Sequence, residues 1–170
     1  MGYTIIDTLD TILLFSLSED GGASLGPSYR RARKWLKDRH TFDLDGTYNT
    51  FELTIRLLGG LLSAHWAEYE LGITPGLHPH QVTAGASNAN DDYDPSDLLY
   101  LKKAVDLAER LVHAFDTRSG LPLSGINLKQ RKGYKSDVEG GLVSTAEVGT
   151  IQLEFRFGRS DIYNPVCVRN

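Results

Sequence analysis

Residues 50–69 read TFELTIRLLGGLLSAHWAEY, and apolar side chains recur along this stretch with the period of an α-helix. The positions that share one helical face are Phe51, Ile55, Leu58, Leu62 and Trp66. The pattern predicts a helix over residues 50–69 that packs along this face. Gly59 and Gly60 lie in its interior, where each glycine costs about 1 kcal/mol relative to alanine. We therefore expect another backbone or a ligand to come close to the helix there.

Four further segments have the same helical period, two on each side of residues 50–69. Strand-length alternation is scarce, so the predicted fold class is all-α. The four segments are residues 3–17, with Ile6, Leu9, Leu13 and Leu17 on one face; residues 28–39, with Tyr29, Ala32, Trp35 and Leu36; residues 95–115, with Asp94 as N-cap, Pro95 as the first residue and a stripe of Leu98, Leu101, Val105, Ala108, Leu111 and Val112; and residues from about Ser144 through Phe155.

Two long connections separate these helices. Residues 72–92 lack the apolar side chains needed for a core, which predicts a surface loop. Residues 120–141 are rich in glycine, and loops of this length are often functional when they are ordered. The recurring order of helix, long loop and helix fits paired helices stacked in layers.

The composition describes one domain, or a piece of a larger one, of an ordinary globular protein. The chain has 170 residues, of which 41% are hydrophobic and 24% charged. Its net charge of −4 argues against a nucleic-acid partner, so the basic side chains of residues 28–39 are interpreted as a solvated helix face. A single cysteine, Cys167, excludes an internal disulfide. No apolar run is long enough to span a membrane, and Asp7 and Asp10 interrupt the apolar start, so no targeting signal is predicted.

The polar residues with most chemical interest are Glu52 and Arg56, which lie four residues apart and share a helix face. A carboxylate in a first helical turn could act as a general acid or bind a sugar hydroxyl. The local alternative is a capping role, since Asn49 and Glu52 have capping-box spacing. Arg56 would favour the ionised form of Glu52, whereas burial would favour the protonated form.

A second first-turn glutamate, Glu147, follows Ser144 with the exact spacing of a capping box. Glu154 lies about two turns further on, roughly on the same face as Glu147. Glu52 and Glu147 both follow a loop, which would place the two acids at the same rim of a helical barrel.

The sequence offers no convincing metal site of its own. His78 and His80 lie in a loop without a third ligand at motif spacing, and solvent exposure explains them better. Asp91, Asp92 and Asp94 lack the glycine and the distal glutamate of a calcium loop.

Five motifs occur in order along the chain: IDTLDT at residues 6–11, FELTIRLLGGLLSA at 51–64, DLAERL at 106–111, LPLSGINL at 121–128 and AEVGTIQLEFR at 146–156. Together they resemble the class I α-1,2-mannosidases, glycoside hydrolase family 47. The resemblance extends over residues 2–157, which is the expected extent of the family domain.

The resemblance implies part of an (α/α)7 barrel that removes terminal α-1,2-linked mannose from N-linked high-mannose oligosaccharides, with inversion and a bound calcium ion. It also implies a location in the lumen of the endoplasmic reticulum or Golgi. In the family scheme Glu52 is the proton donor, Arg56 a substrate-binding neighbour, and Glu147 a contact to the mannose that is cleaved. The catalytic base and the threonine that holds calcium belong to helices outside this chain.

The likeness stops at Phe157, and residues 158–170 are expected to be a non-family tail without helical period. The chain is therefore expected to be a truncated, inactive fragment with uncovered apolar helix faces. Two other functions stay open. One is a degradation-enhancing mannosidase-like protein, and the other is a non-catalytic module that binds high-mannose glycans.

Overall fold

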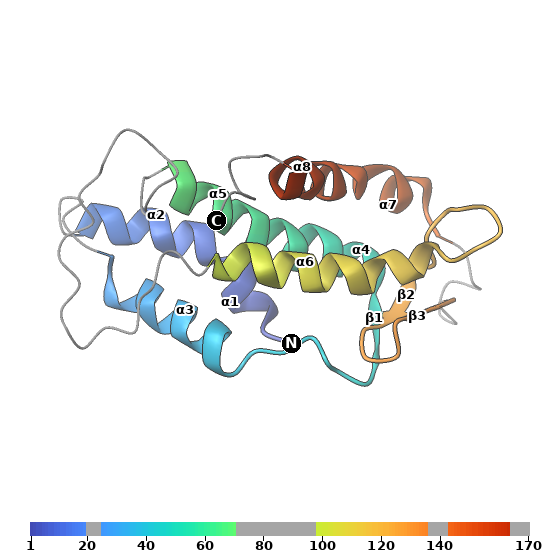
Figure 1. Cartoon of the computed structure of the whole chain (residues 1–170), viewed down its shortest axis with the longest axis horizontal. Helices are drawn as coiled ribbons and strands as arrows, with labels where there is room; N and C mark the ends of the chain where they lie inside the picture. The colour runs from blue at the N-terminus through green and yellow to red at the C-terminus, as the bar shows by residue number, and fades with distance from the viewer. Residues whose placement is uncertain (20–24, 71–97, 136–142, 164–170) are drawn as a thin grey trace.

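The computed structural model describes residues 1–19, 25–70, 98–135 and 143–163, and these are mostly helical, as predicted (Figure 1). A long helical run occupies the centre, and α6 lies alongside it. The elements in chain order are α1 (Tyr3–Asp7), α2 (Leu9–Glu19), α3 (Pro27–Asp38), β1 (Thr47–Asn49), α4 (Thr50–Glu52), the π-helix η1 (Leu53–Leu58), α5 (Gly59–Glu70), α6 (Leu99–Leu111), the 3₁₀ turn η3 (Val112–Phe115), β2 (Gly125–Asn127), β3 (Lys132–Tyr134), α7 (Thr145–Thr150) and α8 (Gln152–Tyr163).

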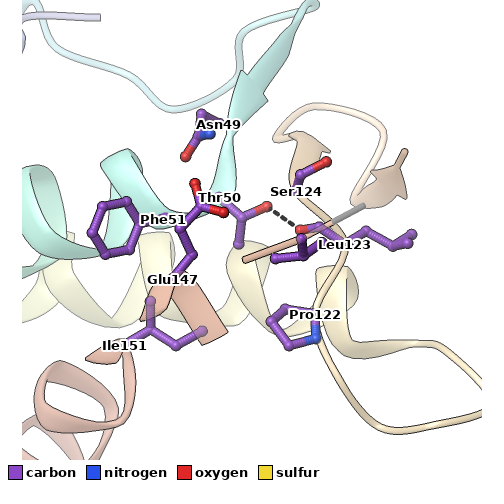
Figure 2. Close-up of a pocket in the computed structure, with 9 residues that line it drawn as sticks. Asn49, Thr50, Phe51, Pro122, Leu123, Ser124, Glu147 and Ile151 are labelled. Atoms are coloured by element: carbon purple, nitrogen blue, oxygen red, sulfur yellow. Dashed lines mark hydrogen bonds between the residues drawn. The ribbon is translucent and has the colours of Figure 1, made fainter. Parts of the chain in front are cut away.

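A small antiparallel sheet, in the order β1-β2-β3, is the part of the fold that the sequence did not predict. Its strands are three residues long, too short to produce a readable alternation. The sheet joins the start of α4, because the Thr50 backbone N–H donates to the Ser124 carbonyl at 2.8 Å. The Thr50 hydroxyl donates to the Leu123 carbonyl at 2.8 Å (Figure 2). Residues 122–124 therefore hold the first turn that carries Glu52.

The predicted helix over residues 3–17 is interrupted at Thr8, which separates α1 from α2. The Thr8 hydroxyl donates to the Thr4 carbonyl at 2.6 Å, a local bond of the kind that bends helices. Ile6, Leu9 and Leu13 are fully buried, as predicted. The side chain of Leu17 lies outside the described residues.

The predicted helix over residues 50–69 is continuous, but its predicted buried face is wrong in part. Trp66 is 44% exposed, whereas Leu53, Leu57 and Leu61 are fully buried. The reason is the π-helix η1, which has more residues in each turn than an α-helix. The buried side chains therefore no longer fall at the positions that α-helical spacing predicts.

The stripe of α6 also differs from the prediction. Val112 is 54% exposed, while Ala104 and Leu107 are buried. The helix begins at Leu99, after Leu98 in a left-handed conformation with φ of 47°. Asp94, the predicted N-cap, and Pro95, the predicted first residue of this helix, lie outside the described residues. The predicted loop over residues 72–92 lies outside them too.

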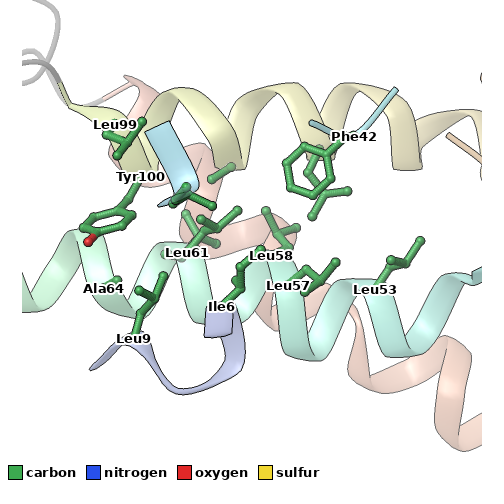
Figure 3. Close-up of a cluster of buried hydrophobic side chains, with 14 of the residues drawn as sticks. Ile6, Leu9, Phe42, Leu53, Leu57, Leu58, Leu61, Ala64, Leu99 and Tyr100 are labelled. Carbon is green, nitrogen blue, oxygen red and sulfur yellow. The ribbon is translucent and has the colours of Figure 1, made fainter. Parts of the chain in front are cut away.

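The core forms where the η1–α5 run packs against α1, α2 and α6 (Figure 3). Apolar side chains from all these elements interdigitate there, and Phe42 closes the end near η1. Large apolar side chains also remain exposed among the described residues: Leu14, Phe15, Trp66, Val112, Leu121 and Leu153. None of the described helices is long and apolar enough to cross a membrane.

The interpretation of the basic side chains of residues 28–39 as a solvated face is wrong for Arg33, which lies on α3. Its neighbours Arg31, Lys34 and Lys37 are exposed as predicted, but the side chains of Arg33 and Glu68 are each only 3% exposed and lie 3.5 Å apart. The Tyr29 hydroxyl donates to the same Glu68 carboxylate oxygen at 2.7 Å. Burial, followed by the Glu68 charge, raises the pKa of Tyr29 well above its usual value. This buried polar cluster links α3 to α5.

The last helix begins after the Ser144 cap, as predicted, with a short interruption at Ile151. It then continues to Tyr163, beyond the predicted end of helical structure at Phe157. At Gly158 an added Cβ atom would lie 3.6 Å from the Leu62 Cδ1 atom, so this part of α8 lies close to α5.

Gly60 is the point where α1 touches the central helix. A Cβ atom at Gly60 would lie 2.6 Å from the Ile6 carbonyl oxygen, which confirms the predicted close approach of another backbone. At Gly59 the nearest atom would be the Glu154 Cγ at 3.6 Å, an ordinary contact.

We expect Gly60→Ala to lower the free energy of unfolding of the 170-residue chain by about 1–3 kcal/mol, because the α1 backbone must move. Gly59→Ala is the matched control. It should be neutral or stabilising by up to about 1 kcal/mol, since alanine favours the helix. Urea unfolding followed by circular dichroism measures both changes, and equal stabilities of the two variants would contradict the packing described here.

His40 is a second buried polar residue, only 6% exposed and packed between the Trp35 and Phe42 rings. One ring nitrogen lies 2.9 Å from the Met1 carbonyl oxygen. Burial is the main cause that lowers the pKa of His40 from 6.5 to about 4.

Because the unfolded chain takes up this proton near pH 6.5 and the folded chain only near pH 4, folding loses stability as the pH falls. We expect a loss of about 3 kcal/mol from His40 between pH 7 and pH 4, and little change above pH 7. Urea unfolding at a series of pH values measures it, with His40→Gln as the control. A pH dependence that is the same in His40→Gln would rule out His40 as its source.

Candidate functional site

The first turns of α4 and α7 lie at the same end of the molecule, next to the sheet (Figure 1). This is the arrangement that the two first-turn glutamates predicted. Glu147 points from α7 toward the start of α4, and its side chain lines a narrow cleft with Asn49 and Thr50 (Figure 2).

Glu52 is held by a cap but does not itself complete the cap. The Asn49 side-chain oxygen accepts a hydrogen bond from the Glu52 backbone N–H at 2.9 Å. The Glu52 carboxylate turns instead to Arg56, whose Nε donates to Glu52 Oε2. The Glu52 side chain is 40% exposed, so a ligand can reach its carboxylate.

Arg56 bridges two carboxylates from distant parts of the sequence. Besides its bond to Glu52, its Nη1 atom donates to Asp7 Oδ2 at 3.1 Å. The hydrogen bond to Glu52, and next the bond to Asp7, raise the pKa of Arg56 above its ordinary value. At this degree of exposure such pairs add little to stability, so the bridge matters mainly for the geometry and charge of the site.

These groups surround an open hollow of about 390 Å³. The volume falls within the usual range of ligand sites, roughly 300–1,000 Å³. Tyr3 also lines it, and burial, followed by the Glu52 charge, raises the pKa of Tyr3. The residues that line it carry hydroxyl, amide, carboxylate and guanidinium groups, which can bind a ligand with several hydroxyls. The full lining is Tyr3, Thr4, Asp7, Thr8, Asn49, Glu52 and Arg56.

Glu147 takes part in a complete capping box. Its backbone N–H donates to the Ser144 hydroxyl oxygen at 3.1 Å, and its Oε2 accepts from the Ser144 backbone N–H at 3.1 Å. Glu147 thus fixes the first turn of α7 and at the same time presents its carboxylate to the cleft beside Asn49.

The polar face of the central helix continues past Arg56. The Ser63 hydroxyl donates to Asp10 Oδ2 at 2.6 Å. On the side of α8, Glu154 lies against Gly59, and its Oε2 atom is buried with no hydrogen-bond partner in the part of the chain that the structure describes. Burial raises the pKa of Glu154.

Asp7 is an acidic residue of the site whose position the sequence did not reveal, and Glu154 was placed only on the Glu147 face of its helix, not against Gly59. The two helix-interior glycines were the available signal, because Gly60 receives α1 close to Asp7 and Gly59 faces Glu154. A metal site is a separate matter: in residues 1–19, 25–70, 98–135 and 143–163, no three His, Cys, Asp or Glu side chains are grouped so as to hold an ion. The candidates in residues 78–94 lie outside these ranges.

Comparison with known proteins matches this chain to one family. The model of glycosyl hydrolase family 47 matches residues 1–157. The mannosyl-oligosaccharide 1,2-alpha-mannosidase of Candida albicans is 38% identical over 157 residues, which cover 92% of this chain and 22% of that protein. The endoplasmic reticulum mannosyl-oligosaccharide 1,2-alpha-mannosidase of Saccharomyces cerevisiae is 35% identical over 159 residues, which cover 92% and 25%.

The protein of the same name from Schizosaccharomyces pombe is 39% identical over 158 residues, which cover 92% of this chain and 23% of that protein. The chain thus spans a quarter or less of the length of these three relatives. Because the family model extends over most of the chain, the chain belongs to glycosyl hydrolase family 47.

Proposed function

We propose that this chain supplies the proton-donor part of an inverting α-1,2-mannosidase that acts on N-linked high-mannose oligosaccharides. The observation that carries the proposal is the position of Glu52, which lines an open hollow at the first turn of α4 together with Asp7, Asn49 and Arg56. The names of the relatives support the substrate class. The names of the relatives from S. cerevisiae and S. pombe also support a location in the secretory pathway.

In the proposed reaction the protonated Glu52 gives its proton to the oxygen of the leaving sugar while the bond to the anomeric carbon breaks. A water molecule attacks that carbon from the opposite face and loses a proton to a second carboxylate, which inverts the configuration. The second carboxylate belongs to a part of the family domain outside this chain. Arg56 and Glu147 are proposed to bind hydroxyls of the mannose.

Calcium is proposed for the complete family domain, where it would bind sugar hydroxyls. The described residues do not fit such an ion by themselves, since the Arg56 guanidinium lies between the Asp7 and Glu52 carboxylates. Calcium prefers a cage of six to eight oxygen atoms. Its protein ligand is therefore expected outside this chain.

A segment exchange tests the proposal. Residues 1–157 would replace the matching segment of the S. cerevisiae relative, and the purified chimera would be assayed for mannose release from a high-mannose oligosaccharide. We expect the chimera to release mannose, and the 170-residue chain alone to release none because it lacks the second carboxylate. A folded chimera without turnover would contradict the proposal. If the 170-residue chain is retained on a mannose column in that case, a glycan-binding module is the better description.

A further inference from the structure

The guanidinium of Arg56 is shared between two carboxylates. Its Nε atom faces Glu52 and its Nη1 atom faces Asp7, so the two bonds use different edges of the same planar group. A planar group that is bonded on two edges has a fixed orientation, whereas one bond would leave it free to rotate on its flexible stem. The position of Arg56 beside Glu52 is therefore set in part by Asp7.

The approach of α1 at Gly60 places Asp7 there. A Cβ atom on Gly60 would lie 3.4 Å from the Asp7 Cα and 2.6 Å from the Ile6 carbonyl oxygen. Gly60 is four residues after Arg56, one turn further along the same face. The missing side chain at Gly60 thus lets Asp7 reach Arg56 across 49 residues of sequence.

We propose that Asp7 is a positioning residue for the proton donor: it holds Arg56 in place and shares the positive charge of Arg56 with Glu52. This inference rests on the proposed function of Glu52. Without the negative charge of Asp7, the Arg56 guanidinium would interact with the Glu52 carboxylate alone. It would then favour the ionised carboxylate, which cannot donate a proton. Asp7 acts through Arg56 and is not itself a proton donor.

The other titratable groups around this pair are few among the described residues. Tyr3 on α1 interacts with both Glu52 and Arg56, and Tyr48 on β1 interacts with Tyr3. Glu147 lines the cleft on the other side of Asn49. Among the described residues, Asp7 is thus the carboxylate that bonds to Arg56 besides Glu52.

The first test uses the 170-residue chain and does not depend on catalysis. Nuclear magnetic resonance measures the hydrogen exchange of the Arg56 Nε–H group in the parent and in Asp7→Asn. We expect exchange about tenfold faster in Asp7→Asn, because the guanidinium loses one of its two anchors. Asp10→Asn is the matched control, since Asp10 bonds to Ser63 and Thr11 and should leave the Arg56 signal unchanged. Equal exchange in the parent and in Asp7→Asn would overturn the positioning role.

The second test uses the chimera described above. Asp7→Asn should lower kcat by about tenfold or more with little change in KM, and should move the alkaline limb of the pH–rate profile toward lower pH. In an Arg56→Gln background the same change should have no further effect, because the residue through which Asp7 acts is gone. Additive losses, or an unmoved alkaline limb, would show a merely structural role. An inactive parent chimera would contradict the proposed function of Glu52, while the exchange measurement would still decide the role of Asp7.

Discussion

Replacing Glu52 by glutamine in the chimera should lower kcat for mannose release by about 10²–10⁴-fold, the usual contribution of a general acid. Glutamine keeps the size of the side chain, and its carbonyl oxygen can still accept the hydrogen bond from Arg56 Nε. It has no acidic proton, so the leaving oxygen departs unassisted. The rate is measured with a high-mannose oligosaccharide, and thermal unfolding shows whether the fold is retained.

The control for this substitution is Glu109→Gln, an exposed glutamate on α6 away from the hollow. It removes the same charge and should leave kcat within about twofold of the parent, since surface substitutions have small effects. A Glu52→Gln chimera with near-parent activity would exclude Glu52 as the proton donor. Turnover by the 170-residue chain itself, abolished by Glu52→Gln, would show that the second carboxylate is not needed from outside.

The largest loss of stability is expected from Glu68→Ala, about 3–5 kcal/mol in the free energy of unfolding. The substitution leaves the Arg33 charge buried without its carboxylate and removes the acceptor of the Tyr29 hydroxyl. Urea unfolding of the 170-residue chain measures the change. Its magnitude is a large part of the 5–15 kcal/mol that stabilises an ordinary domain, so the variant should unfold at a clearly lower urea concentration than the parent.

Two comparisons separate the buried charge from other causes. Asp38→Ala removes the exposed partner of Lys34 and should cost less than about 1 kcal/mol, because both side chains are solvated. The double variant Arg33→Met with Glu68→Leu should recover much of the stability, since it removes both charges and keeps apolar volume. A double variant as unstable as Glu68→Ala would mean that packing, rather than the loss of the Glu68 carboxylate beside Arg33, causes the instability.

The positions of the helices could be read from the sequence, but the faces that they bury could be read only in part. Periodicity identified residues 50–69 correctly, because apolar side chains dominate that stretch. It assigned Trp66 to the core and missed Leu57, since the angle per residue changes within η1. Arg33 was placed on the solvated face because no local pattern indicates that Glu68, on another helix, lies opposite it.

The same distinction applies to the candidate site. Glu52 and Arg56 are four residues apart on one helix, so their contact follows from local geometry. The contact between Arg56 and Asp7 depends on how α1 packs, and that information is spread over the whole core. The roles of Glu52, Arg56 and Glu147 in binding and cleaving mannose stay predictions until the variants are assayed.

The π-helix η1 lies between the proposed acid and the glycine that receives α1, and this has a consequence for how the segment can change in evolution. A deletion of one codon within residues 53–58 that left the remaining residues π-helical would rotate Glu52 relative to Gly60 by roughly the angle that one residue subtends, on the order of 100°. Ordinary replacements in η1 alter packing locally, but a change in the length of this turn would aim the acid in a different direction. The length of η1 is therefore expected to be under stronger selection than most of its individual side chains.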